Sequence, residues 1–289
     1  MLAVGALLLA LTVTSLAAAS DSSRSGERGR RVGTRIVFEN NQTCAGGNDC
    51  GRGEIAVVNL NGSGFRRLTH DLTSEESAAW SPAKRRIAFY RNLSIWVMDA
   101  NGHHQRRLTN TAYANEPDWS PNGRQIVFSG GTTGYGGLWT MNVATGQKTR
   151  VLWGKASADA PAWSPDGTRI AFGSNRSGTE QIWILRLRDH RLTQITKPTG
   201  SPHEMSYMPA WSPDGRRIAV WRDGYIWVIR ADGSHARPVG VSAESFTWSA
   251  DGRWIVFTER SLYAIHPDGS GRHLIRHEAG RWGDTGPDG

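Results

Sequence analysis

One phrase recurs along the chain, and it stands complete as Trp163-Ser164-Pro165-Asp166-Gly167 and as Trp211-Ser212-Pro213-Asp214-Gly215. Related phrases begin at Trp80, Trp119 and Trp248, so consecutive tryptophans lie 39, 44, 48 and 37 residues apart. The Asp-Gly and Asn-Gly pairs accept the positive φ that a tight turn between strands requires. A strand-rich unit with this period predicts blades of a repeat fold.

Two short apolar segments accompany each phrase, and their β-branched and aromatic residues favour strands. The first segment recurs at residues 35–38, 86–89, 125–128, 169–172, 217–220 and 254–257. The second recurs at residues 55–58, 95–98, 138–141, 182–185, 226–229 and 262–265. Six copies of each predict an all-β fold, a six-bladed β-propeller of four-stranded antiparallel blades.

The first blade lacks its own tryptophan phrase, because the ordered pattern begins at Arg35 on what would be the second strand of a blade. We therefore expect Gly280-Arg281-Trp282 to supply the innermost strand of that blade. The ring would then be closed by pairing of N- and C-terminal strands, which leaves only short, protected edges.

This repeat resembles the WD-like repeat of the TolB-type propellers, and the resemblance covers about residues 33–283. It concerns the propeller part only. Blades of this kind also serve exported binding proteins, serine peptidases and some lyases, so the resemblance implies the fold more firmly than the function. It implies a non-catalytic module that binds a protein or peptide partner through the loops at the channel mouth.

The N-terminal segment predicts export. Residues 2–19 carry no charge, are rich in Leu and Ala, and end in Ala17-Ala18-Ala19, which is the pattern of a signal peptide. Residues 1–19 are therefore expected to be a signal peptide, or alternatively a membrane anchor, followed by a basic flexible segment at 20–32. Residues 284–289 form a tail. The expected location is periplasmic, cell-envelope or secreted, with possible membrane association.

Composition narrows the partners. The formal net charge is +8, but the arginines recur at outer-strand and turn positions, where they are typical of a solvated rim. No aromatic and basic stripe of the kind that binds single strands is present, so we expect no nucleic acid. The two cysteines, Cys44 and Cys50, are separated by five residues in one loop, and an exported address favours a disulfide between them.

Acidic residues recur shortly before the tryptophans, in the loops that enter the innermost strands. The predicted channel-mouth residues are Glu76, Tyr113, Glu116, Asp159, His203, Glu204, Tyr207, Glu244 and Glu278. In a sixfold ring these carboxylates would surround one opening and bind a cation, a basic peptide or an amine. Alternatively, each accepts backbone hydrogen bonds in a tight loop and serves the repeat itself.

Catalytic motifs are absent from the sequence. It contains no Gly-x-Ser-x-Gly, and the His-Glu pairs at 203–204 and 277–278 lack the second histidine of a zinc motif. We expect no cofactor, no resident metal and a monomer. Two alternatives stay open: a carbohydrate lyase or hydrolase assisted by a metal at His203 and His277, and a sensory ectodomain held at the membrane by residues 2–19.

Overall fold

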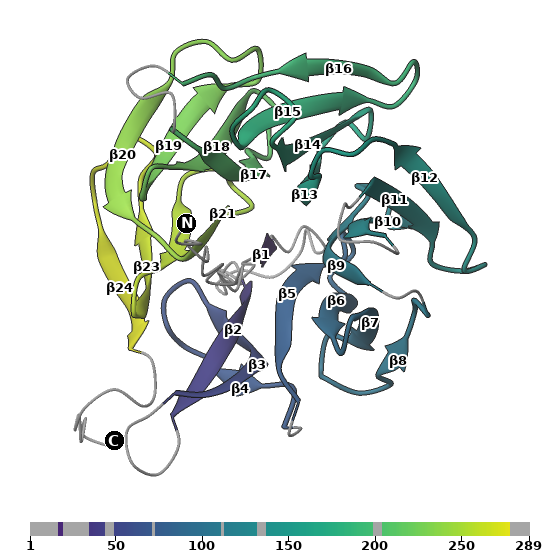
Figure 1. Ribbon diagram of the computed structural model, residues 1–289. Helices are drawn as coiled ribbons and strands as arrows, with labels where there is room; N and C mark the ends of the chain where they lie inside the picture. The colour runs from purple at the N-terminus through teal and green to yellow at the C-terminus, as the bar shows by residue number, and fades with distance from the viewer. Residues whose placement is uncertain are drawn as a thin grey trace, which may run out of the picture.

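The computed structural model describes residues 17–19, 35–43, 49–70, 73–110, 113–131, 137–198 and 204–277. Within these ranges, 24 strands form six four-stranded sheets around one centre, and the pairing of strands within every sheet is antiparallel (Figure 1). The predicted six-bladed propeller is confirmed. No helix in the described part of the chain has the length and apolar character needed to cross a membrane.

Each blade consists of four strands that are consecutive in the sequence. Blades one and two contain β1 (Ala17–Ala19), β2 (Arg35–Thr43), β3 (Asp49–Asn59), β4 (Arg66–Arg67), then β5 (Glu75–Trp80), β6 (Arg86–Arg91), β7 (Ser94–Asp99) and β8 (Arg106–Arg107). Blades three and four contain β9 (Ala114–Trp119), β10 (Gln125–Gly130), β11 (Gly137–Asn142), β12 (Lys148–Leu152), then β13 (Asp159–Trp163), β14 (Arg169–Ser174), β15 (Gln181–Arg186) and β16 (Arg191–Gln194). Blades five and six contain β17 (Ser206–Trp211), β18 (Arg217–Arg222), β19 (Tyr225–Arg230), β20 (Arg237–Ser242), then β21 (Ser245–Trp248), β22 (Ile255–Thr258), β23 (Ser261–Ile265) and β24 (His273–His277).

The hydrophobic core lies between neighbouring blades. Each of the six apolar clusters joins residues of two adjacent sheets, for example Ile170 and Phe172 of blade four with Val127 and Leu138 of blade three. The second strands of four blades contribute a fully buried phenylalanine: Phe89, Phe128, Phe172 and Phe257. Burying such a side chain contributes about 1.5–3 kcal/mol, so the stability of each blade depends on its neighbours.

In three of the five phrases, a hydrogen bond from the tryptophan links neighbouring innermost strands. All five of these tryptophans are buried. The indole Nε1 of Trp211 donates to the carbonyl oxygen of Ala162 at 3.2 Å, and that of Trp248 donates to Ala210 at 3.0 Å, in each case on the preceding blade. The same bond joins Trp119 to Ala79. A large aromatic ring with one polar group suits this position, because the ring fills the interface while its N–H satisfies a carbonyl.

The remaining residues of the phrase form a turn that packs on the next blade. The Ser164 hydroxyl donates to Asp166 Oδ1 at 2.6 Å and accepts from the backbone N–H of Arg169 at 2.9 Å. Gly167 has φ +73°, and a Cβ there would approach the Pro121 ring of the preceding blade to 3.3 Å. Proline and glycine of successive phrases therefore interlock around the ring.

The two incomplete phrases flank the blade that has none. Ala250 stands where the other four phrases have proline. Lys84 stands where the other four phrases have glycine and adopts φ +54°. Lys84 therefore keeps the positive φ that glycine has in the other phrases.

Blade one differs from the sequence-based expectation in its innermost strand. That place is taken by β1, in which Ala17, Ala18 and Ala19 pair with Val37, Ile36 and Arg35 of β2. The expected segment at residues 280–282 lies outside the described residues. Ladder hydrogen bonds use backbone groups that any segment supplies, so the side-chain pattern did not specify which terminus would pair. The ring closes through an apolar cluster in which Ile36 and Phe38 meet Val256 and Leu262 of blade six.

Candidate functional site

A cavity of about 250 Å³ occupies the centre of the ring, where the innermost strands converge (Figure 1). Small or rigid residues two positions before four of the five tryptophans form much of its wall, namely Ala78, Pro117, Pro161 and Pro209. Glu116 and Asp118 are the carboxylates that line it. The channel is therefore apolar in most of its wall and acidic on the side of blade three.

A β-bulge recurs in the innermost strands of blades two to five. The residues three positions before the tryptophan, Ser77, Glu116, Ala160 and Met208, all have φ between 48° and 55°. The register against the second strand shifts at the same place in each of these blades. Blade six pairs in regular register. Bulges turn side chains out of the regular alternation, and here they set the direction of the residues at the channel.

Glu116 bridges blades three and four at the mouth of the channel. Its Oε2 accepts from the Ser129 hydroxyl at 3.0 Å and from the backbone N–H of Ala160 at 2.6 Å. Burial, followed by repulsion from Asp159 and Glu180, raises the pKa of Glu116 to about 7. Glu116 therefore combines the two predicted roles of these carboxylates: it accepts a backbone hydrogen bond, and it belongs to a group of like charges at the channel.

Asp159 and Glu180 complete this group on blade four. Burial raises the pKa of Glu180 to about 7 even though the Ser157 hydroxyl donates to Glu180 Oε2 at 3.0 Å, and burial also raises the pKa of Asp159. Arg176 lowers the pKa of Glu180, but no ion pair within 4 Å joins these described carboxylates to a basic side chain. We call Glu116, Asp159 and Glu180 the mouth cluster.

Asp118 lies deeper in the channel. Its two carboxylate oxygens accept from the backbone N–H groups of Trp119 at 2.9 Å and Trp163 at 2.6 Å, which ties blade three to blade four. Burial raises the pKa of Asp118 to about 6. Asp118 therefore adds negative charge to the same side of the channel once it ionises.

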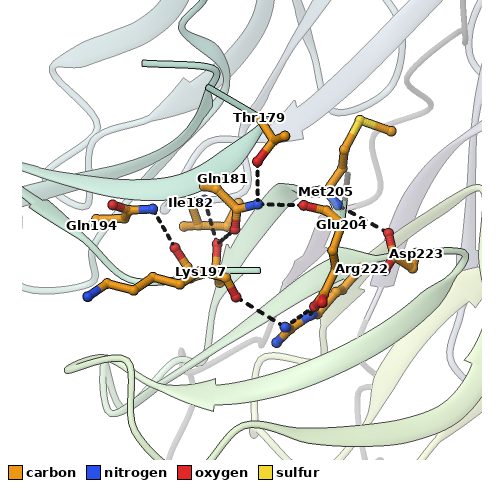
Figure 2. Close-up of polar contacts among 10 residues, drawn as sticks. Thr179, Gln181, Ile182, Gln194, Lys197, Glu204, Met205, Arg222 and Asp223 are labelled. Carbon is orange, nitrogen blue, oxygen red and sulfur yellow. Dashed lines mark hydrogen bonds and ion pairs between the residues drawn. The ribbon is translucent and has the colours of Figure 1, made fainter. Parts of the chain in front are cut away.

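Blades two and five each pair one acidic residue near the mouth with an arginine. Glu75 Oε1 and Arg91 Nε are 2.9 Å apart, and Glu204 forms an ion pair with Arg222, with both side chains 7–8% exposed (Figure 2). Arg91 and Arg222 both end the second strand of their blade, whereas Ser174 ends it in blade four. Burial still raises the pKa of Glu75 despite the nearby guanidinium.

The long loop that precedes blade five is held at both of its described ends (Figure 2). Arg222 donates to the carbonyl oxygen of Lys197 at 3.2 Å, and Gln181 Nε2 donates to that of Glu204 at 2.7 Å. The backbone N–H of Met205 donates to Asp223 at 3.1 Å. Glu204 thus lies in a buried polar network beside the mouth.

The structure places the other predicted mouth residues as follows. Glu76 accepts from the Ser74 hydroxyl at 3.3 Å, and burial raises its pKa. Tyr113 is 41% exposed, and Glu244 is exposed at the entry to β21. Tyr207 stacks on Trp221 with ring centroids 4.3 Å apart. His203, Glu278 and Cys44 lie outside the described residues; Cys50 lies in β3, and its pairing with Cys44 stays a prediction.

Among the residues that the structure describes, no group of three or more His, Cys, Asp or Glu side chains is arranged to hold a metal ion. The mouth cluster can instead accept hydrogen bonds from a cationic group such as an ammonium or a guanidinium. Charge-assisted hydrogen bonds of this kind are roughly twice as strong as neutral ones.

Comparison with known proteins gives the fold a relative. The family model described as the TolB beta propeller domain matches residues 134–267. The propeller is TolB-like. The Tol-Pal system protein TolB 1 of Novosphingobium aromaticivorans is 38% identical over 73 residues, which are 23% of this chain and 16% of that protein. The crystal structure of TolB from Acinetobacter baumannii matches with a TM-score of 0.70 and 21% identity, over 86% of this chain and 64% of that chain.

These similarities cover only part of the related proteins and concern the fold. The chain covers less than two thirds of the length of the first of these relatives in either comparison. A solved oligogalacturonate lyase in complex with manganese also matches, with a TM-score of 0.59 and 12% identity, over 85% of this chain and 74% of that chain. At such identities the likeness concerns the fold alone, because one propeller scaffold carries unrelated functions.

Two carboxylates of the TolB-like channel, Asp118 and Glu180, were not among the predicted mouth residues. Glu180 precedes β15, in the loop between the second and third strands. Because strands alternate in direction, that loop lies on the same face as the loop entering the innermost strand. Counting acidic residues in both loops would have found it.

Proposed function

We propose that this protein is an exported, non-catalytic TolB-like propeller that binds a protein or peptide partner at the channel mouth. The proposal rests on the mouth cluster: Glu116 lines the channel, Asp159 and Glu180 act on it electrostatically, and none of the three has a basic partner within 4 Å among the described residues. Repulsion among buried carboxylates is unfavourable, and a cationic group of a partner would relieve it. A lysine or arginine of the partner fits this requirement.

Exposed apolar side chains on the same face supply a second type of contact. Leu93 is 51% exposed beside Tyr113, since the backbone N–H of Ala114 donates to the Leu93 carbonyl at 3.1 Å. Across the ring, Met205 and Tyr225 are 44% and 53% exposed. Tyrosine and methionine are common in protein interfaces. A partner that places a basic residue at the channel would lie against these side chains.

Export is supported by two observations. Residues 2–19 have the composition of a signal peptide, and the curated relatives are Tol-Pal system proteins. The mature protein is then expected to begin near Ala19, and intact mass with N-terminal sequencing of the exported protein tests this. Cleavage there would remove β1 (Ala17–Ala19), so a different segment would have to pair with β2 in the mature protein. A mature chain that retains residues 2–19 would favour the membrane-anchored alternative.

The binding proposal is tested with two matched baits. The first carries Glu116→Gln, Asp159→Asn and Glu180→Gln, and the second loses three carboxylates elsewhere through Glu259→Gln, Asp189→Asn and Asp268→Asn. Proteins captured from envelope extract by the unaltered propeller are identified by mass spectrometry, and each purified candidate is titrated by calorimetry. Losing one charge-assisted bond costs about 1.5–3 kcal/mol, so the first bait should bind the partner at least about tenfold more weakly.

The binding proposal also predicts the direction in which affinity changes with pH. Because the pKa values of Glu116 and Glu180 are raised to about 7, both carboxylates gain charge as the pH rises from 6 to 8. Affinity for a cationic partner should increase over that interval, and it should increase less in the first bait, where Asp118 is the remaining channel carboxylate with a pKa raised to about 6. Equal affinity of both baits, or turnover of a substrate at this face, would remove the proposal.

A further inference from the structure

A second site lies between blades four and five, on the face opposite the mouth. Arg217 begins β18 and Arg222, beside the mouth, ends it, so the two residues are separated by about 17 Å at the usual rise of a strand. The groove at the Arg217 end has a volume of about 660 Å³. Its charged lining residues are Arg169, Asp214, Arg216, Arg217, Arg230 and Asp232.

The cross-strand pairing in this groove is unfavourable. Arg217 of β18 lies directly opposite Arg230 of β19. Side chains at such positions have Cβ atoms about 4.5–5.5 Å apart, and like charges there are destabilising. The same position in blade two pairs Arg86 with Asp99, which are opposite charges. Blade five therefore departs from the arrangement that would stabilise the sheet.

Blade four shows how the repeat can compensate such a pair. Arg169 lies opposite Arg186, yet each has its own carboxylate: Arg169 is 3.0 Å from Asp166, and Arg186 is 2.5 Å from Asp189. In blade five no ion pair within 4 Å is formed by the guanidinium groups of Arg216, Arg217 and Arg230, all of which the structure describes.

The aspartates of the groove are directed to the backbone instead. Asp214 Oδ1 accepts from the Ser212 hydroxyl at 2.6 Å and the Arg216 backbone N–H at 3.0 Å. Asp232 accepts from the Ser234 N–H at 2.9 Å. The Arg217 guanidinium lies over the Trp248 ring at 4.8 Å, which fixes its position without neutralising its charge. Asp214 and Asp232 are close enough to interact electrostatically with Arg216, Arg217 and Arg230, so these arginines are partly compensated although no ion pair within 4 Å forms. Preorganised arginine is the usual element of oxyanion recognition.

We propose that this groove binds a phosphate-bearing ligand whose oxygens accept hydrogen bonds from Arg216, Arg217 and Arg230. Phosphate is favoured over carboxylate because its three oxygens and charge near −2 can engage several guanidinium groups from different strands at once. The volume exceeds that of one phosphate, so the ligand extends beyond it, either as a soluble phosphate ester or as a phospholipid headgroup. The site is separate from the channel mouth and does not depend on the function proposed there.

Calorimetric titration with pyrophosphate at low ionic strength tests the site. The variant Arg216→Gln/Arg230→Gln should lose binding by at least tenfold. The matched control is Arg85→Gln/Arg124→Gln, because Arg85 and Arg124 occupy in blades two and three the position that Arg216 has in blade five. It removes the same charge, yet it should bind like the unaltered protein. Thermal melting should show both variants folded, and a saturable rise of the melting temperature with pyrophosphate should be absent only in the first.

Sedimentation with vesicles of phosphatidylglycerol and phosphatidylcholine in equal parts separates the two ligand sources. Vesicle binding that pyrophosphate displaces, and that Arg216→Gln/Arg230→Gln abolishes, assigns the headgroup. Pyrophosphate binding without vesicle binding assigns a soluble phosphate ester. Absence of saturable pyrophosphate binding, or equal weakening in the two double variants, would overturn the proposal, since either result would reduce the effect to net charge.

Discussion

Blades four and five are neighbours built from the same complete phrase, yet they leave charge uncompensated on opposite faces. At the mouth, blade four presents Asp159 and Glu180 without an ion pair, whereas blade five pairs Glu204 with Arg222. On the far face the order is reversed, because Arg169 and Arg186 of blade four have carboxylate partners within 4 Å, whereas Arg217 and Arg230 at the same positions of blade five do not.

The difference separates charged residues that stabilise their own blade from charged residues that are left without a counter-ion. A charge that is paired within its own blade contributes to packing or solubility and requires nothing else. A charge held by neighbouring backbone or aromatic rings, but left without a counter-ion, is stable only at a cost, and such sites are enriched at functional positions. By this criterion the molecule has a negative site at the mouth and a positive site on the far face.

Breaking the buried Glu204–Arg222 ion pair of blade five should have the largest effect on stability. Arg222→Leu removes the partner of Glu204 and leaves a carboxylate in a buried position, which costs about 3–5 kcal/mol. Guanidinium denaturation monitored by tryptophan fluorescence measures the change. The double variant Glu204→Gln/Arg222→Leu should recover much of the loss. If the two variants are equally unstable, the cost belongs to the arginine contacts with Lys197 rather than to the unpaired charge.

Removing a carboxylate that has no ion pair, such as Glu180 in blade four, should instead raise stability at high pH. The pKa of Glu180 rises from its ordinary value to about 7 on folding, so the folded state holds more protons than the unfolded state between about pH 4.5 and 7. Its contribution to stability is present below that interval and is lost as the pH rises through 7. Glu180→Gln should therefore be more stable than the unaltered protein at pH 8, by on the order of 2 kcal/mol, with little difference at pH 5.

The control for this prediction is Glu259→Gln. Glu259 is 2.8 Å from Arg272 and is half exposed, so it should change the free energy of unfolding by well under 1 kcal/mol at either pH. Parallel stability curves for the two variants between pH 5 and pH 8 would show that Glu180 is not ionising as the burial requires.

The fold was predictable because each residue of the phrase has a local role. Trp211, Ser212 and Gly215 act through neighbours at fixed offsets, so their repetition specifies the blades directly. The innermost strand of blade one was not predictable by the same means. Its ladder hydrogen bonds are independent of side chains. The sequence pattern favoured residues 280–282 because of Trp282, whereas in the structure Ala17–Ala19 pairs with β2.

The candidate site was predictable only in outline. The acidic residues before the tryptophans led to the prediction of Glu116 and Asp159 as mouth residues. The same rule also predicted Glu204, although Glu204 is paired with Arg222. What separates them is Arg222, 18 residues further along the chain, and its counterpart Ser174 in blade four. Charge compensation depends on residues brought together across strands, which a count along one loop does not reveal.

The tryptophans of the two blades extend the comparison to neutral groups. Trp211 Nε1 donates to the Ala162 carbonyl at 3.2 Å, whereas Trp163 Nε1 is buried without a hydrogen-bond partner. Trp211→Phe should cost about 1–2 kcal/mol more than Trp163→Phe, because only the first substitution leaves a carbonyl unsatisfied. Thermal and denaturant unfolding of the two variants measure the difference. A larger loss for Trp163→Phe would mean that ring packing, and not the hydrogen bond, dominates at this position.

The smallest effect is expected from the arginines of the far face, and it should have opposite signs in the two blades. Arg230→Gln removes a like charge that faces Arg217, so it should leave stability unchanged or raise it by up to about 0.5 kcal/mol. Arg186→Gln breaks a solvent-exposed ion pair with Asp189 and should lower stability slightly. The difference should shrink in high salt, because surface charges are screened. Equal changes of the same sign would show that blade five bears no electrostatic strain, and the groove between blades four and five would then lose the feature that distinguishes it from the rest of the basic rim.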